Sequence, residues 1–452
     1  MSEPLPTRSA RPTVGARMDR LPITRTHRML TLAVGLGLFF DVYEVFLAGV
    51  LGQVLVREFH LPKTWLPMLL GSGFLGMAIG ATLLGRFADR LGRRKAFLVG
   101  LWAYSLFSFV GAFSVGPVML LVTRFLAGIG IGAEPPLADA YLGDLLPAKE
   151  RGRYIAWAYT VGFLGVPTAG FLAHAMTSVT LLGISGWRWM FVIGALGTLV
   201  LYPLRRRLPE SPRWLESTGR HEEADRWVSQ LEAEAGGARS PEPEPPPSPR
   251  PPRGDLRELW VPPYRRRMVM MTVFQLLQPF AYYGFGTLVP LVLTAKGYSV
   301  VKSLLFSGIT FIGYPLGSLL SSWILDRVER KYVVAGALFG MGLFGTAFGH
   351  ATATPWILTL GFLYTATSNV FSNGFHVYQA ELFPTSLRGV ACGGTYALSR
   401  LSNAAMPFLL VPLLDTRGVG ALFAVIVTMV VINGLNVALL GPRTTGRSLE
   451  HI

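Results

Sequence analysis

Charged residues and cysteine are both scarce in this chain of 452 residues. Asp, Glu, Lys and Arg make up 15% of it, whereas soluble domains contain about 25%. Hydrophobic residues make up 51%, which leaves too little polar surface to cover a soluble fold of this size. Cys392 is the only cysteine, which excludes a disulfide framework, a thiolate metal cluster and a redox pair.

Patterns of catalytic residues are also lacking. No grouping of His with carboxylates has the spacing of metal ligands, and no nucleophile stands in a known arrangement with a base. We therefore expect neither an enzyme activity nor a cofactor. The formal net charge of +15 does not indicate a nucleic-acid partner, because no binding motif or basic soluble domain accompanies it.

Long apolar stretches dominate the sequence. Each is close to or above the roughly 20 residues that a helix needs to cross a bilayer. They predict twelve membrane spans, at about 30–56, 65–85, 96–115, 117–143, 152–176, 188–204, 268–294, 301–325, 332–350, 355–379, 389–414 and 419–440. The expected fold class is an all-α integral membrane protein whose twelve transmembrane helices contact the lipid bilayer.

The two halves of the chain repeat each other. Segment 143–152 recurs as 380–389, and Asp89-Arg90 recurs as Asp326-Arg327. The offsets, 380 minus 143 and 326 minus 89, are both 237, so a single register aligns the two matches. Each match lies in a short charged link between apolar stretches. This pattern is typical of a membrane protein built from two parallel six-helix repeats.

The repeats predict five parts of the chain. They are an N-terminal tail at 1–29, a six-helix bundle at 30–204, a central loop at 205–267, a second bundle at 268–440 and a C-terminal tail at 441–452. Arginine and lysine concentrate in the tails and in the links on their side of the membrane, so the positive-inside rule predicts cytoplasmic termini. Within the central loop we expect an amphipathic helix at 219–235 and a proline-rich linker at 241–252.

Four segments resemble motifs of the major facilitator superfamily. Segment 85–95, Gly-Arg-Phe-Ala-Asp-Arg-Leu-Gly-Arg-Arg-Lys, looks like the hallmark loop between its second and third helices, and 124–132 resembles its fourth-helix motif. Segments 209–215 and 441–450 resemble signatures of the branch with sugar porters, aromatic-acid and nicotinate carriers and organic-ion transporters. This resemblance implies the major facilitator fold, transport by alternating access and a bacterial inner-membrane location. Arg443 departs from the branch, which usually has Glu at this place in the tail.

The charged links on the side of the termini are the candidate gate. An acid there can face the amino end of a helix, and arginines can face carboxylates. We expect such contacts to latch the two halves together when the pore opens outward, although the arginines could instead serve only to set the topology. The predicted latch residues are Asp89, Arg90, Arg93, Arg94, Asp144, Arg151, Asp326, Arg327, Glu381 and Arg388.

Three acids at membrane depth, Asp41, Glu44 and Glu134, are the candidate proton-coupling residues. A charge at the centre of a bilayer costs about 2.5–3.5 kcal/mol on insertion scales, so it must face a cavity or a partner. Asp41 lies near the middle of the first span, and Glu44 shares its helix face. The resemblance to aromatic-acid and nicotinate carriers implies such an acidic pair on this helix. For Glu134 the alternative is a structural ion pair with Arg124 or with an arginine of a neighbouring helix.

One basic residue at membrane depth indicates the charge of the ligand. Arg400 lies near the middle of the eleventh span, with Tyr396 and Asn403 on the same face. In the organic-ion carriers that this segment resembles, the residue at this place is acidic for cations and basic for anions, so the resemblance implies an anionic ligand. A guanidinium can bind a carboxylate through two parallel hydrogen bonds. The alternative is a buried ion pair between Arg400 and one of the three acids.

Polar and aromatic residues on two further spans are candidates for the cavity wall. Amide and phenol groups suit a small polar ligand, and aromatic rings suit a ligand ring. The alternative is that these side chains only pack the helices, and that His376 gates the cavity or carries protons. The candidates are Gln275, Gln278, Tyr282 and Tyr283 on the seventh span and Asn369, Asn373 and His376 on the tenth.

The sequence thus predicts a monomeric, proton-coupled carrier of a small organic anion. An aromatic or heteroaromatic carboxylate is preferred over a sugar acid. Its partners would be this carboxylate, protons and the lipid bilayer, with no nucleic acid. Three other hypotheses remain open: a proton-coupled sugar or polyol symporter, which Gln275 and Gln278 favour, a drug or metabolite efflux antiporter, and a membrane receptor that does not transport.

Overall fold

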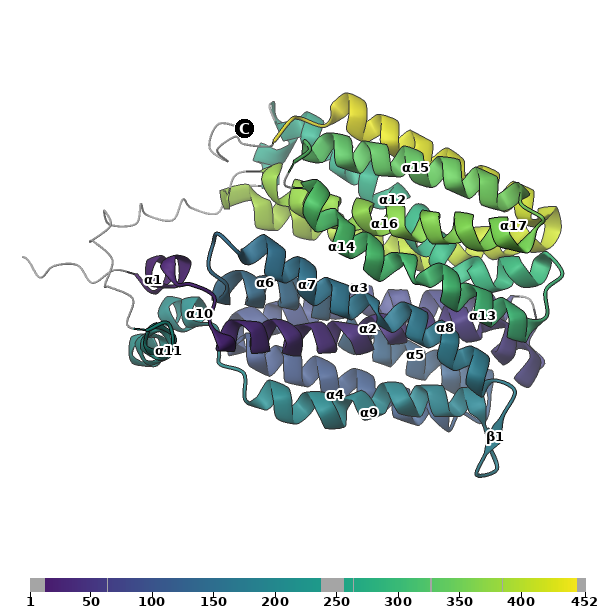
Figure 1. Cartoon of the computed structure of the whole chain (residues 1–452), viewed down its shortest axis with the longest axis horizontal. Helices are drawn as coiled ribbons and strands as arrows, with labels where there is room; N and C mark the ends of the chain where they lie inside the picture. Colours follow the sequence, from purple (N-terminus) through teal and green to yellow (C-terminus); the bar gives the residue numbers. More distant parts are fainter. Residues whose placement is uncertain are drawn as a thin grey trace, which may run out of the picture.

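The computed structural model describes residues 13–62, 64–236, 256–262, 264–325, 327–383 and 385–444. Long helices run side by side in two groups, which correspond to the two repeats (Figure 1). The first group contains α2 (Arg25–Glu58), α3 (Trp65–Leu91), α4 (Arg93–Ala112), α5 (Pro117–Ile131), α6 (Glu134–Leu145), α7 (Arg151–Phe163), α8 (Gly165–Met176) and α9 (Gly186–Arg206). The second contains α12 (Tyr264–Ala295), α13 (Val300–Phe311), α14 (Gly313–Leu325), α15 (Arg330–His350), α16 (Thr354–Glu381) and α17 (Thr385–Leu440).

Shorter elements lie at the two ends of the bundle. At one end are α1 (Val14–Arg20), α10 (Pro212–Ser217), α11 (His221–Glu234) and the short 3-10 helix η1 (Leu256–Trp260). The last described residues, which follow α17, lie at this same end, and we call it the termini end. At the opposite end, β1 (Thr180–Leu181) pairs with β2 (Ile184–Ser185) in an antiparallel hairpin (Figure 1).

Every predicted span is helical in the structure. Within the described residues, ten helical stretches are long and apolar enough to cross a membrane. One of them, Ala391–Leu440, contains both the eleventh and the twelfth predicted spans, separated by non-helical Gly418 at φ 76°. The remaining predicted span is α16, which carries polar residues such as Asn369 and Asn373. The twelve transmembrane helices, six in each group, are therefore confirmed.

Proline explains why three of the spans are broken into two helices. The second helix of each broken span has a proline in its first turn, at Pro135, Pro167 and Pro315. Proline cannot donate a backbone hydrogen bond, and its ring displaces the carbonyl group four residues earlier. The first helices, α5, α7 and α13, each end four residues before the proline, at the residue whose carbonyl is displaced.

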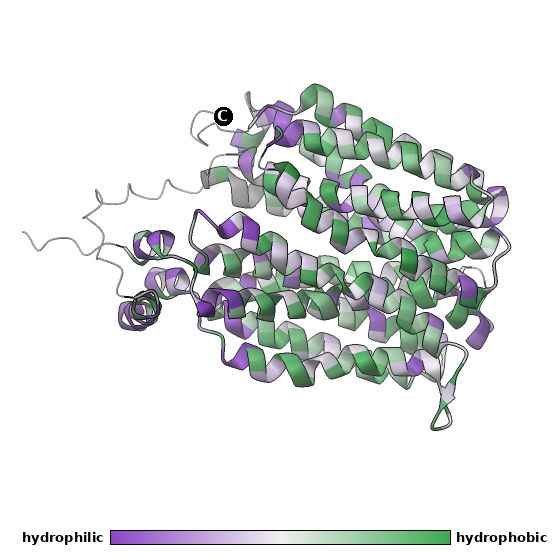
Figure 2. Cartoon of the chain, viewed as in Figure 1, coloured by the Kyte–Doolittle hydropathy of each residue, from purple (hydrophilic) through white to green (hydrophobic). Residues whose placement is uncertain are grey.

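Three short helices form a polar cap on the first half. Polar residues concentrate in α1, α10 and α11, whereas the long helices are largely apolar along their length (Figure 2). Arg17 of α1 donates to Glu232 of α11 at 2.8 Å. Asp19 of α1 accepts from Arg151 at the start of α7 and from Arg213 of α10, both at 2.7 Å. These ion pairs join the N-terminal helix and the central loop to the same half of the bundle.

The two halves contact each other closely at the end opposite the termini. Gly170 of α8 packs against Gly308 of α13, and Gly49 of α2 packs against Thr287 of α12. An added side chain at Gly170 or Gly49 would collide with the facing backbone. The missing side chains therefore let the helix backbones of the two halves approach each other directly.

The hallmark loop is held by an acid from the central loop. Gly92 separates α3 from α4 at φ 103°, and a Cβ atom there would collide with the carboxylate of Glu210. Oε1 of Glu210 accepts from the backbone N–H groups of Arg93 at 2.8 Å and Arg94 at 3.3 Å. The acid thus caps the positive end of α4. The sequence predicts that an acid of the loop itself, Asp89, faces the amino end of a helix. The side chain of Asp89 lies outside the described residues.

The duplication in the sequence is repeated as an ion pair in each half. Nε of Arg93 lies 3.8 Å from Oδ2 of Asp144, and Nε of Arg330 lies 3.4 Å from Oε1 of Glu381. Arg330 lies 237 residues after Arg93, and Glu381 lies 237 residues after Asp144. Each pair joins the link between the second and third helices of a repeat to the end of its fourth helix.

Two of the other predicted latch residues, Arg94 and Arg327, also make contacts within one half. Arg94 donates to the backbone oxygen of Leu208 at 3.4 Å, and the Arg327 guanidinium lies 5.3 Å from the Trp323 ring centre. Arg90 is exposed. Asp326 and the side chain of Arg388 lie outside the described residues. A latch between the two halves therefore stays a prediction for a conformation other than this one.

The cap on α4 leads to a stability prediction. Glu210→Gln keeps an acceptor but removes the charge at the helix end, so we expect a loss of about 0.5–1 kcal/mol in the free energy of unfolding. Glu210→Ala removes the acceptor as well and should cost about 1–2 kcal/mol. Thermal unfolding of the purified protein measures both. The control is Glu150→Gln, because Glu150 forms only a partly exposed pair with Arg153 at 3.6 Å; equal melting temperatures for all four proteins would contradict the cap.

Candidate functional site

A cavity lies between the two halves, near the middle of the long helices. Its empty space measures about 910 Å³, including the part that opens to solvent. The predicted residues that line it are Asp41, Gln275, Gln278, Tyr282, Tyr283, His376, Tyr396 and Arg400. The cavity thus collects side chains from α2, α12, α16 and α17, which are far apart in the sequence.

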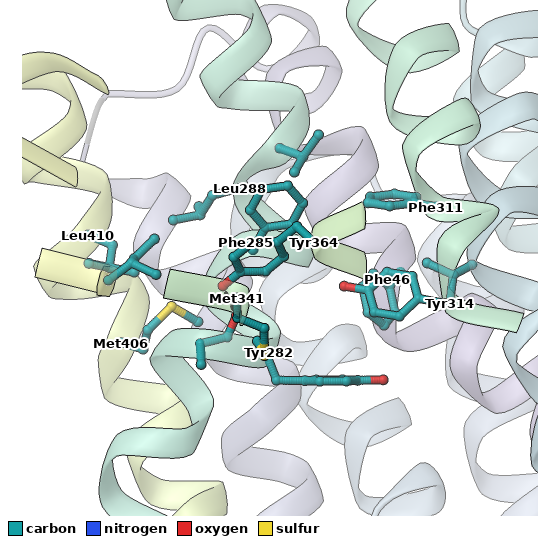
Figure 3. Packing of buried hydrophobic residues seen from close by; sticks show 14 of the residues in the cluster. Phe46, Tyr282, Phe285, Leu288, Phe311, Tyr314, Met341, Tyr364, Met406 and Leu410 are labelled. Atoms are coloured by element: carbon teal, nitrogen blue, oxygen red, sulfur yellow. Dashed lines mark hydrogen bonds between the residues drawn. The ribbon is translucent and has the colours of Figure 1, made fainter. Parts of the chain in front are cut away.

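Aromatic rings from both halves form one side of the cavity. Phe46 of α2 lies 6.3 Å from the Tyr283 ring of α12 and 5.6 Å from the Tyr314 ring of α14, measured between ring centres. Figure 3 shows Phe46 beside Tyr314, with Tyr282 extending from α12 near them. Phe163 of α7 also lines the cavity and stacks on Tyr314 at an interplanar angle of 17°. These rings can pack against a flat ligand.

Arg400 is buried without an acidic partner among the residues that the structure describes. Its side chain donates to the Tyr283 hydroxyl at 3.3 Å and to the Tyr396 hydroxyl, and its guanidinium lies 4.6 Å from the Tyr396 ring centre. Only 4% of the residue is exposed, and its Nε atom has no hydrogen-bond partner within the described part of the chain. Among the described residues no carboxylate lies within ion-pair distance. The alternative that Arg400 pairs with one of the three acids is therefore not what this structure shows.

Asp41 is the acid that the cavity contains. Asp41 is 2% exposed, and neither of its carboxylate oxygens has a hydrogen-bond partner among the described residues. Arg205 and Glu44 lie within electrostatic range of it. Tyr104 of α4 lies close enough to interact with this carboxylate electrostatically. The first span therefore presents to the cavity a carboxyl group that none of the described residues neutralises by direct contact.

Glu44 and Glu134 are held in buried ion pairs instead. Oε2 of Glu44 lies 2.7 Å from Nη1 of Arg124 on α5, and Oε1 accepts from Ser108. Glu134 accepts from Arg205 of α9 through both carboxylate oxygens, one of them at 3.2 Å. The observed partner of Glu134 is thus an arginine of a neighbouring helix rather than Arg124. Neither acid lines the cavity, so its predicted coupling role stays a prediction.

Glycine provides the space for both ion pairs. A Cβ atom at Gly194 of α9 would collide with Oε1 of Glu44, and one at Gly37 of α2 would collide with the guanidinium of Arg205. The charged groups therefore occupy grooves that exist because these helix positions have no side chain.

The predicted asparagines hold helices together. Asn369 donates to the backbone oxygen of Tyr314 at 2.6 Å and accepts from the Tyr282 hydroxyl at 3.1 Å. Asn373 donates to Ser321 at 2.7 Å. These bonds connect α16 to α14 and α12, and neither asparagine lines the cavity. Asn403 is also buried away from it, with no partner for either amide atom among the described residues.

The predicted glutamines do reach the cavity. Oε1 of Gln278 accepts from the Ser399 hydroxyl at 3.4 Å. Gln275 is 1% exposed, and its Nε2 atom has no partner among the described residues. Gln275 can therefore donate a hydrogen bond to a ligand oxygen.

Sequence reasoning missed residues on the fourth and fifth spans. Tyr159 and Phe163 of α7 line the cavity, and the Tyr159 hydroxyl donates to Asp139 of α6 at 2.9 Å. The two aromatic residues are four positions apart and share a helix face, which is a detectable signal. Asp139 is an acid within an apolar span, which is the same signal that selected Asp41.

Comparisons with known proteins agree with this architecture. The family model of the Major Facilitator Superfamily matches residues 32–407. The niacin transporter NiaP of Acinetobacter baylyi is 29% identical over 438 residues, which are 97% of this chain and 99% of that protein. The gallate transporter of Pseudomonas putida is 29% identical over 390 residues, 85% of this chain and 84% of that protein.

A solved structure shows the same fold. The xylose transporter XylE from E. coli, in a partially occluded inward open conformation, superposes with a TM-score of 0.76 and 21% identity over 93% of this chain and 99% of that one. The relatives are membrane transporters rather than enzymes, as the sequence predicted for this chain. With two six-helix repeats around a central cavity and a family match over most of its length, the chain belongs to the major facilitator superfamily.

Proposed function

We propose that this protein is a proton-coupled transporter of a small carboxylate attached to an aromatic or heteroaromatic ring. The observation that carries the proposal is Arg400, a buried cation on the cavity wall with no acidic partner among the described residues. Burying an unpaired charge is costly, so an anionic ligand would supply the missing partner. A carboxylate can accept two parallel hydrogen bonds from the planar guanidinium.

The aromatic lining and the relatives support a ring-bearing ligand. Phe46, Phe163 and Tyr283 offer faces against which a ring can pack. NiaP and the gallate transporter are named for niacin and gallate, and both compounds are ring carboxylates. The second candidate is a neutral sugar or polyol, which Gln275 and Gln278 on the same wall favour.

Asp41 is the proposed site of the coupled proton. Its carboxyl group lines the cavity without a neutralising contact from the described residues, so it can take up a proton from one side of the membrane and release it to the other. The basic links at the termini end support cytoplasmic termini. We further propose that the protein works as a monomer in a bacterial inner membrane.

The anion site is tested at Arg400. Arg400→Gln leaves the charge of a bound carboxylate unpaired in the cavity, which typically costs about 3–5 kcal/mol and should weaken nicotinate binding by about a hundredfold or more. Arg400→Lys should restore little, because an ammonium cannot reproduce the two-pronged geometry. Calorimetry with nicotinate and with its neutral amide measures the difference. If acid and amide lose equal affinity in Arg400→Gln, the residue supports helix packing and the sugar hypothesis takes precedence.

The coupling role is tested at Asp41. Asn keeps the shape of Asp but cannot carry the proton, so Asp41→Asn should lose accumulation of nicotinate against its gradient in proteoliposomes. Binding and exchange of nicotinate across the membrane should continue. Glu222→Gln, at an exposed position of α11, is the control and should transport normally. Continued uphill accumulation by Asp41→Asn would place the coupled proton elsewhere.

The electrical balance gives a third test. One proton that moves with one monoanion transfers no net charge, so transport should follow the pH gradient and ignore the membrane potential. Each additional charge would contribute about 2.3 kcal/mol per 100 mV. Uptake by proteoliposomes under an imposed potential of either sign should therefore be equal at a fixed pH gradient. A current that scales with substrate flux rejects the one-to-one scheme.

A further inference from the structure

Tyr159 connects a carboxylate of the first half to an imidazole of the second half beside the cavity. The Tyr159 hydroxyl of α7 donates to Oδ1 of Asp139 on α6 at 2.9 Å. The Tyr159 ring stacks on the His376 ring of α16, with 6.1 Å between ring centres and an interplanar angle of 28°. Asp139 and His376 are within electrostatic range of each other. Tyr159 thus lies between two titratable groups that belong to different halves.

This group lies between the cavity and the termini end. Tyr159 and His376 both line the cavity. His376 is five residues before the end of α16, and Asp139 is six residues before the end of α6. At 1.5 Å per residue, both are about 8–9 Å from the helix ends. A proton that leaves the cavity toward the termini end would pass this group.

The surroundings of His376 can accept both protonation states of the ring. Nε2 of Gln379 lies 3.4 Å from Nδ1 of His376, so this amide can donate to the unprotonated Nδ1 of a neutral ring. Oε1 of Gln379 is buried without a partner among the described residues. Rotation of the amide would present this oxygen to a protonated Nδ1.

Two charges act on His376 in opposite directions. A carboxylate near an imidazole favours the protonated ring, and a guanidinium opposes it. Asp139 is bonded to Tyr159, whose ring stacks on His376, and Arg400 lines the same cavity as His376. Tyr283 of α12 and Tyr396 of α17 are the other titratable groups around Tyr159. A bound anion would neutralise the charge of Arg400. The electrostatic repulsion that opposes protonation of His376 would then be lost.

We propose that His376 binds a proton and that this proton site is distinct from Asp41. The charge of Arg400 links proton binding at His376 to anion binding, and Asp139 of the other half offsets the effect of Arg400. Anion and proton binding then favour each other, because linkage is reciprocal. The link to a substrate anion rests on the proposed function, whereas the balance between Arg400 and Asp139 does not require a ligand.

The ligand-free part is tested by the protonation of His376. Nitrogen NMR of protein with ¹⁵N-labelled histidine distinguishes protonated from neutral rings, and His376→Gln assigns the signal among the seven histidines. Between pH 5 and 8, Arg400→Gln should raise the ratio of protonated to neutral rings by about threefold or more, and Asp139→Asn should lower it by a similar factor. The ratio falls as pH rises in every variant.

The control variant removes a positive charge that belongs to the second half, as Arg400 does, but is not part of the group around His376. Lys302→Gln, at an exposed position of α13, should leave the His376 ratio unchanged. Tyr159→Phe keeps the stacked ring but loses the hydrogen bond to Asp139, and it should change the ratio less than Asp139→Asn does. Ratios that are the same in the parent, Arg400→Gln and Asp139→Asn would overturn the proposal.

Nicotinate is the probe for the linked part. Added to the parent protein, it should raise the protonated fraction of His376 as Arg400→Gln does, and it should have no further effect in Arg400→Gln. An effect of Arg400→Gln together with no detectable binding of nicotinate rejects the proposed substrate class and keeps the histidine site. Binding of nicotinate that leaves His376 unchanged keeps the substrate class and rejects the link.

Discussion

The energetic cost of a buried, unpaired charge governs where this chain keeps its ionisable side chains. In the first half, Glu44 and Glu134 are each paired with an arginine of another helix. Asp41 and Arg400 have no such partner among the described residues, and both line the cavity between the halves. The unpaired charge is thus concentrated at the place where a ligand or a proton can compensate it.

The local properties of the sequence predicted most of the fold. A membrane span depends on the length and polarity of one continuous stretch, so the twelve helices could be read directly from the apolar runs. The 237-residue offset also relates residues that lie outside the repeated motifs. It relates the pair of Arg93 with Asp144 to the pair of Arg330 with Glu381, although no single motif contains both partners of a pair.

The site was less predictable, because helix periodicity shows which residues share a face but not where the face points. Asn369 and Asn373 share a face with His376, yet they bind α12 and α14 while His376 reaches the cavity. Partner choice has the same difficulty. Glu134 is close in sequence to Arg124, but its partner in the structure is Arg205 of α9, 71 residues away in the sequence.

The two buried ion pairs depend on the glycines that form the grooves around them. A side chain at Gly37 would displace Arg205 and leave Glu134 without its partner, although no charge has been altered. Glycine also weakens a helix by about 1 kcal/mol relative to alanine, so these helices lose intrinsic stability at the positions that accommodate the charges. During divergence of the family, such a glycine and the ion pair beside it are expected to be retained or lost together.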